Sequence, residues 1–147
     1  MHRSFVNLLS DDPARLRGWY VSLFGWRVDF DSDWFVHLQA PDHDDVELGI
    51  LRADHELVPG ELRGRAAGVI VTIVVDDADE VHARAIEQGV EVIEAPRDLF
   101  YGQRRLLLRD PDGTVVDVSS ECDADPDVIA SLSGEAGAGA PAGQEAQ

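Results

Sequence analysis

The chain has 147 residues, 44% of them hydrophobic, and a formal net charge of −17 that arises from 29 acidic and 12 basic residues. This length and composition suit one globular domain, or two small modules that share a core. The negative field repels phosphate backbones and anionic lipids, so we expect neither nucleic acid nor a membrane as a partner.

The first half of the chain predicts one strand, one helix and three further strands. Residues 4–9 are mostly apolar, which is typical of a strand. Asp12 and Pro13 predict the start of a helix, because an acidic cap and a proline in the first turn favour one, and Gly25 predicts its end. A turn is predicted at 42–45. The three strands are expected at residues 26–30, 34–39 and 46–51.

The second half repeats this order of elements. Residues 69–75 form a continuous β-branched run, which predicts a buried strand. Asp77 begins a second helical pattern that ends at Gly89, and a tight turn is predicted at 110–113. The predicted fold class is therefore α+β, with two strand–helix–three-strand modules. The last three strands are expected at residues 90–94, 104–109 and 114–119.

Composition divides the chain into a first module at 1–52, a connector at 53–68, a second module at 69–121 and an acidic, Gly/Ala-rich tail at 122–147. We expect the tail to be disordered, apart from a helical turn at 127–133. The single cysteine excludes an internal disulfide and favours a cytoplasmic location. No apolar run approaches the roughly 18 residues of a membrane span, and the N-terminus has no signal-peptide core.

Two acids recur at one position of the repeat. Glu47 lies six residues after Pro41, and Asp117 lies six residues after Pro111. A duplicated unit with a carboxylate at the same place predicts a two-fold cavity that receives one acid from each module.

Two stretches of the sequence resemble motifs of a known superfamily. Residues 19–25, with Trp-Tyr and Leu-Phe-Gly, are similar to the end of its first helix, and residues 101–113, with Tyr-Gly-Gln-Arg and Asp-Pro-Asp-Gly, are similar to its hairpin. Over residues 4–121 the chain resembles the vicinal oxygen chelate proteins, which include glyoxalase I, bleomycin-resistance proteins and extradiol dioxygenases. The resemblance implies two tandem βαβββ modules whose curved mixed sheets surround a shared cavity, and a homodimer.

The resemblance also implies the positions at which metal ligands would lie. Metal-dependent members take their ligands from the first and fourth strands of each module. In this sequence the positions are Phe5 and Ile70 on the first strands and Glu47 and Asp117 on the fourth strands. Neither a phenyl ring nor an isoleucine can bind a metal, and the nearby Asn7 and Thr72 are poor ligands for a transition metal. We therefore expect no resident cofactor, with a divalent metal on the two acids as the alternative.

Aromatic and charged residues near these positions predict a ligand pocket. Trp34 and Phe35 are adjacent on a strand and face opposite sides of the sheet, as do Arg104 and Arg105. Two carboxylates beside aromatic walls favour an aromatic or cationic ligand, unless an arginine pairs with them. The predicted ligand-binding residues are Phe5, Asn7, Trp34, Glu47, Ile70, Thr72, Tyr101, Arg104 and Asp117.

These observations favour a metal-free protein that sequesters a small molecule. The alternative is a metal-dependent glyoxalase-like lyase, isomerase or dioxygenase that uses Glu47 and Asp117. A third hypothesis is a metal-free enzyme with one of these acids as general base, and enzymatic activity stays open. His37 is the one histidine on a predicted strand. We expect it to be a half-exposed sheet residue, with a role as ligand or base as the alternative.

Overall fold

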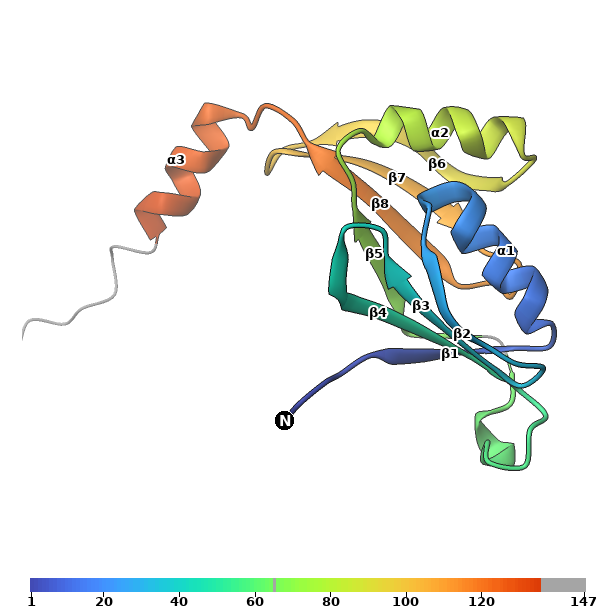
Figure 1. The fold of residues 1–147 in the computed structure, drawn as a ribbon. Coiled ribbons are helices and arrows are strands. Elements are labelled where there is room, and N and C mark those ends of the chain that lie inside the picture. The colour runs from blue at the N-terminus through green and yellow to red at the C-terminus, as the bar shows by residue number, and fades with distance from the viewer. Residues whose placement is uncertain (65, 136–147) are drawn as a thin grey trace, which may run out of the picture.

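The computed structural model of the chain describes residues 1–64 and 66–135 (Figure 1). The first module consists of β1 (Val6–Ser10), α1 (Pro13–Phe24), β2 (Arg27–Asp31), β3 (Phe35–Ala40) and β4 (His43–Arg52). A short 3-10 helix, Gly60–Leu62, lies in the connector. The second module consists of β5 (Ile70–Val74), α2 (Ala78–Glu87), β6 (Glu91–Leu99), β7 (Gln103–Arg109) and β8 (Val115–Glu121), and α3 (Pro126–Glu135) follows it.

Local chemistry sets both ends of α1 and the start of α2. The Asp12 side chain accepts a hydrogen bond from the Arg15 backbone N–H at 3.1 Å, which caps α1. Gly25 ends α1 with a φ of 69°, a left-handed conformation that favours glycine. The Asp77 side chain accepts from two backbone N–H groups at the start of α2, at 2.8 and 3.3 Å. Each cap was expected from the sequence.

Both modules have the same sheet topology. The first sheet has the order β1-β4-β3-β2 and the second has the order β5-β8-β7-β6. The first strand of each sheet pairs in parallel with the fourth, and the remaining pairs are antiparallel. The predicted α+β fold with two βαβββ modules is therefore confirmed.

Three elements differ from the sequence expectation. β4 begins at His43 rather than at residue 46, because Ala40 already pairs with His43 across a short turn. β6 continues to Leu99 rather than ending at residue 94, and its pairing with β7 is irregular around Pro96, a residue that edge strands tolerate. The tail was expected to be disordered apart from a helical turn at 127–133, but it contains the ten-residue helix α3. Residues 136–147 lie outside the described residues.

The two modules share one hydrophobic core. α1 packs on β3 and β4, α2 packs on β6, β7 and β8, and the two helices contact each other (Figure 1). The core contains side chains of both sheets, such as Ile50 and Leu108, which are each fully buried. One face of each sheet is therefore covered by a helix, and alternating residues point to the other face.

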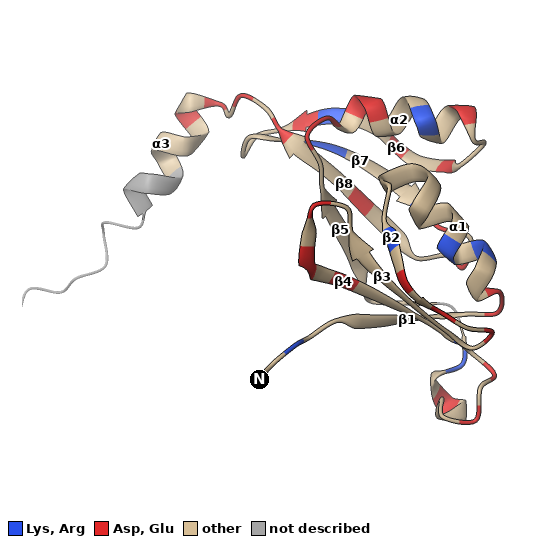
Figure 2. Cartoon of the chain, in the orientation of Figure 1, with Lys and Arg blue, Asp and Glu red and all other residues tan. Residues whose placement is uncertain are grey.

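Acidic residues are spread over strands, turns and helices of both modules (Figure 2), in keeping with the net charge of −17. None of the helices within the described residues has the length and apolar character needed to cross a membrane.

Candidate functional site

Strand register decides which side chains share the uncovered face of each sheet. In the first sheet, Gly49 of β4 pairs with Asn7 of β1 on one side and with His37 of β3 on the other. In the second sheet, Thr72 of β5 pairs with Asp117 of β8. We call these surfaces the first and second open faces. The first is defined by Phe5, Asn7, Phe35, His37 and Glu47, and the second by Ile70, Thr72, Arg105 and Asp117.

Four charged or titratable side chains form a cluster on the first open face. His37 lies between two carboxylates, with Nδ1 2.9 Å from Asp29 Oδ2 and Nε2 2.9 Å from Glu47 Oε2. The Arg3 guanidinium donates from Nε to both Glu47 oxygens, at 2.9 and 2.8 Å. Its Nη2 lies 2.8 Å from His37 Nε2. Residues from the N-terminal segment and from β2, β3 and β4 thus meet at one point.

The partners of the His37 ring fix its hydrogen-bonding roles. Nδ1 faces a carboxylate, which is an acceptor, so Nδ1 donates to Asp29. Nε2 then accepts from Arg3, because a guanidinium has only donors. His37 Nε2 and the Glu47 carboxylate therefore both face the Arg3 guanidinium.

Within the cluster, two buried side chains, Glu47 and His37, lie beneath an exposed one, Arg3. We call the buried pair the floor of the site and Arg3 its occupant. The side chains of Glu47 and His37 are 7% and 5% exposed, whereas the Arg3 side chain is 54% exposed. The hydrogen bond from Arg3 holds the pKa of Glu47 below its usual value, although burial of the carboxylate acts in the opposite direction. The same hydrogen bond raises the pKa of Arg3. An ionised Glu47 therefore lies at the base of the first open face, beneath a guanidinium.

Aromatic rings surround this polar floor. The Phe5 ring meets the His37 ring edge-on, with centroids 5.3 Å apart, and the Arg3 guanidinium carbon lies 5.2 Å from the Phe5 centroid. Phe35 lies 6.5 Å from His37. A β-carbon at position 49 would lie 1.9 Å from Asn7 Oδ1, so glycine there leaves room for the Asn7 amide over β4. Charge and aromatic surface thus occur together on this face.

The second open face is more exposed. The Asp117 carboxylate accepts a hydrogen bond from the Ser119 hydroxyl at 2.7 Å, and Ile70 is 61% exposed. Arg105 shares this face, since it pairs with Ser119, and its buried Nε has no hydrogen-bond partner in the described part of the chain. Arg104 instead lies on the helix-covered side, where it donates to Asp79 of α2 at 2.7 Å.

The structure brings together only some of the residues predicted for the site. Phe5, Asn7 and Glu47 meet on the first open face, and Ile70, Thr72 and Asp117 meet on the second. Trp34 stacks on His55 of the connector at 4.4 Å, and Tyr101 lies in the β6–β7 turn against Phe100 at 5.2 Å. The sequence interpretation did not include Arg3 and Asp29.

The expectation for His37 was wrong in one respect. The residue is 4% exposed overall, so it is a buried histidine rather than a half-exposed one. The repeated acid at position 47 was a sequence signal for this face. No sequence pattern indicated the partners of Glu47, because Arg3 lies 44 residues away in the sequence and His37 lies on a neighbouring strand.

The residues present do not fit a resident metal within one chain. Phe5 and Ile70 carry no donor atoms, and Glu47 already faces a guanidinium. No group of three or more His, Cys, Asp and Glu side chains within residues 1–64 and 66–135 is arranged to hold a metal ion. Glu47 and Asp117 also lie on different sheets.

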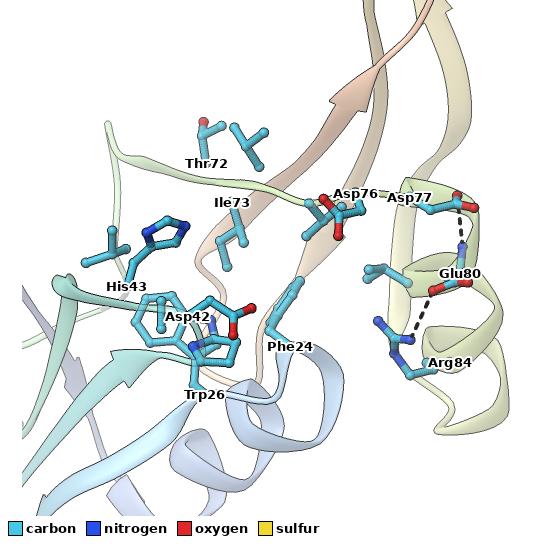
Figure 3. A pocket seen from close by; sticks show the side chains of 16 residues that line it. Phe24, Trp26, Asp42, His43, Thr72, Ile73, Asp76, Asp77, Glu80 and Arg84 are labelled. Carbon is cyan, nitrogen blue, oxygen red and sulfur yellow. Dashed lines mark hydrogen bonds and ion pairs between the residues drawn. The ribbon is translucent and has the colours of Figure 1, made fainter.

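A separate groove lies between the modules, where β5 passes the β3–β4 turn (Figure 3). Its volume is about 660 Å³. Phe24, Trp26 and Ile73 line it, together with the Arg84–Glu80 ion pair of α2. Thr72 reaches this groove, but Glu47 and His37 do not line it. The groove and the first open face are therefore distinct surfaces.

Comparisons with known proteins agree with this topology. The sequence profile of the Glyoxalase/Bleomycin resistance protein/Dioxygenase superfamily matches residues 4–118. A comparison with curated proteins gives no match.

Solved structures share the fold at low identity. A glyoxalase/bleomycin resistance protein/dioxygenase family enzyme from Burkholderia phytofirmans PsJN is 22% identical with a TM-score of 0.69, and the match covers 80% of this chain and 97% of that one. TioX from Micromonospora sp. ML1 is 23% identical with a TM-score of 0.62, over 84% and 98% of the two chains. Lactoylglutathione lyase from Agrobacterium tumefaciens is 18% identical with a TM-score of 0.61, over 79% and 90%.

Proposed function

Because the chain belongs to the Glyoxalase/Bleomycin resistance protein/Dioxygenase superfamily, we propose that it is a metal-free small-molecule-binding protein that sequesters an aromatic or cationic ligand. The observation that carries this proposal is the first open face. There a buried, ionised Glu47 and a buried His37 lie beneath an exposed cation and beside the Phe5 ring.

The chemistry of this face suits recognition of a cation with an apolar body. A buried carboxylate gives a charge-assisted hydrogen bond to a cationic group, and its directionality orients the ligand. Phe5 and Phe35 supply apolar contact and attract a cation through their ring faces. Apolar burial would provide most of the affinity, and Glu47 would provide the selectivity for charge.

We further propose that a second copy completes the pocket. Edge strands β1 and β5 expose apolar side chains, with Val6 at 56%, Ile70 at 61% and Val74 at 69%. Exposed apolar edge strands favour pairing with another chain. In a symmetric homodimer, the first open face of one chain would lie against the second open face of its partner and give two equivalent pockets.

The binding proposal is tested by a thermal-shift screen of aromatic amines, amidines and neutral aromatic compounds against the wild type and Glu47→Gln. We expect cationic aromatic compounds to raise the Tm of the wild type, and the Glu47→Gln variant to lose this response. Stabilisation by neutral and cationic compounds alike in both proteins would contradict the role of Glu47.

Elemental analysis of the purified protein separates this proposal from the metal-dependent alternative. A protein that retains near-stoichiometric Ni, Zn, Mn or Fe(II), and loses it on Glu47→Ala, would instead be a metal-dependent lyase, isomerase or dioxygenase.

The dimer is tested by light scattering coupled to gel filtration. We expect a dimer for the wild type and a monomer for Val74→Lys, because a charge on β5 opposes burial of that edge. Ile86→Lys is the matched control, since Ile86 is an apolar residue of similar exposure, 60%, on α2. A wild-type monomer, or dissociation by both variants, would refute the proposed interface.

A further inference from the structure

We propose that Arg3 is a displaceable occupant of the first open face, and that the ligand binds there through a guanidinium or amidinium group. This inference rests on the proposed binding function and specifies its ligand class. It also assigns a function to the N-terminal segment: the segment closes the site when no ligand is bound.

The contacts of Arg3 describe the group that the site accepts. Its guanidinium uses Nε to reach both oxygens of Glu47, and Nη2 to reach Glu47 Oε2 at 2.5 Å as well as His37 Nε2. A planar, forked donor satisfies these acceptors together, because its N–H groups diverge within one plane. An ammonium group lacks that planar fork. The geometry therefore favours an amidinium or guanidinium over a simple amine.

Arg3 and its two partners, Glu47 and His37, lie in parts of the fold whose backbones are held with different firmness. Glu47 and His37 lie on paired strands β4 and β3, and their side chains are almost fully buried. Arg3 precedes β1, in residues 1–5 that form neither helix nor strand, and its side chain is 54% exposed. A segment whose backbone is not paired in a sheet moves away at a lower cost than a paired strand. The acceptors would therefore remain in place after Arg3 leaves.

The charge of Glu47 gives a reason for Arg3 to occupy the site. Without Arg3, the ionised Glu47, whose side chain is 7% exposed beneath it, would lose its counter-ion, and a poorly solvated charge without a counter-ion is costly. A ligand cation can take over this role. Displacement of Arg3 requires only residues 1–4 to move, so Phe5, which adjoins Val6 of β1, keeps its ring beside His37 for an aromatic ligand, as it now offers it to Arg3. The site therefore selects a flat cation joined to an aromatic body.

Competition with Arg3 predicts a measurable change in affinity. If Arg3 fills the site in about nine molecules of ten, the apparent affinity for a competing cation falls about tenfold relative to the open site. Removal of the Arg3 charge should therefore strengthen binding. A residue that forms part of the ligand pocket would have the opposite effect when removed.

The experiment uses benzamidine as the aromatic amidine, with benzylamine as the matched ammonium and benzamide as the matched neutral amide. Calorimetric titrations at pH 7 compare the full-length wild type, Arg3→Gln and Arg3→Gln/Glu47→Gln. Arg17→Gln is the control for loss of one surface cation, because Arg17 pairs with Asp31 on the helix-covered side of the first sheet.

We expect Arg3→Gln to bind benzamidine about tenfold more tightly than the wild type, and more tightly than it binds benzylamine or benzamide. Arg17→Gln should match the wild type, and the double variant should lose binding. Benzamidine binding by Arg3→Gln that is equal to or weaker than that of the wild type would overturn the proposal that the ligand displaces Arg3. The proposed binding function would remain if other compounds from the screen bind through Glu47. Absence of binding by every screened compound to every variant would overturn both proposals.

Discussion

Replacing Tyr20 by phenylalanine removes one hydroxyl that joins the two modules. Tyr20 of α1 is 0% exposed, and its hydroxyl donates at 3.0 Å to Oδ2 of Asp110, which is 3% exposed and follows β7. The other carboxylate oxygen accepts two backbone N–H groups, from Asp112 and Thr114, each at 2.9 Å. Tyr20→Phe therefore leaves Oδ2 buried without its donor.

The expected cost follows from the charge of the acceptor. A hydrogen bond to a charged group contributes about 1.5–3 kcal/mol, and the phenylalanine ring fills the same space, so we expect a loss of about 2 kcal/mol. For a domain of this size this corresponds to a fall in Tm on the order of 8 °C. Urea denaturation at pH 7 measures the free-energy change directly.

The pH dependence gives a second check on the same bond. Burial raises the pKa of Asp110, and the Tyr20 hydrogen bond opposes this by favouring the ionised carboxylate. Loss of the hydroxyl should raise the pKa of Asp110 further. The loss in free energy of unfolding caused by Tyr20→Phe should therefore shrink as the pH falls through this pKa. Tyr101→Phe is the matched control, because Tyr101 is 46% exposed, and we expect a change within about 0.5 kcal/mol. Equal stabilities of the two variants at pH 7 would refute the reasoning.

Two further predictions concern Glu47 and the start of α2. The Arg3 hydrogen bond lowers the pKa of Glu47, so its ionised form adds stability above the unfolded pKa of about 4.3 that is lost as the pH falls through the lower, folded pKa. Glu47→Gln should be less stable than the wild type to urea at pH 7, with a gap that closes between pH 5 and pH 2; a constant gap would contradict this. Asp77→Ala should lose about 1 kcal/mol in urea denaturation, because two backbone N–H groups lose their cap, whereas Asp76→Ala should not.

Only part of the candidate site could be predicted from the sequence. The repeated acid placed Glu47 on the uncovered face of its sheet, and the alternation of strand residues restricted Arg104 and Arg105 to opposite sides. Which arginine shares a face with Asp117 depends on the pairing of Arg105 with Ser119, a register set by the neighbouring strand. Sequence reasoning assigned Arg104 to the pocket, but its side chain is engaged by Asp79 of α2.

Patterns within short stretches of the sequence were enough to predict the two modules, their helix ends and the α+β class. These features depend on short-range causes, namely hydrophobic periodicity, the caps at Asp12 and Asp77 and the left-handed end at Gly25. The cation that neutralises Glu47 could not be predicted in this way and was identified from the three-dimensional arrangement of the chain. Arg3 is near the N-terminus, shows no periodic pattern and meets Glu47 across 44 residues of sequence. Such a contact depends on how the strands pair and where the chain end lies in space, and no local pattern encodes that distance.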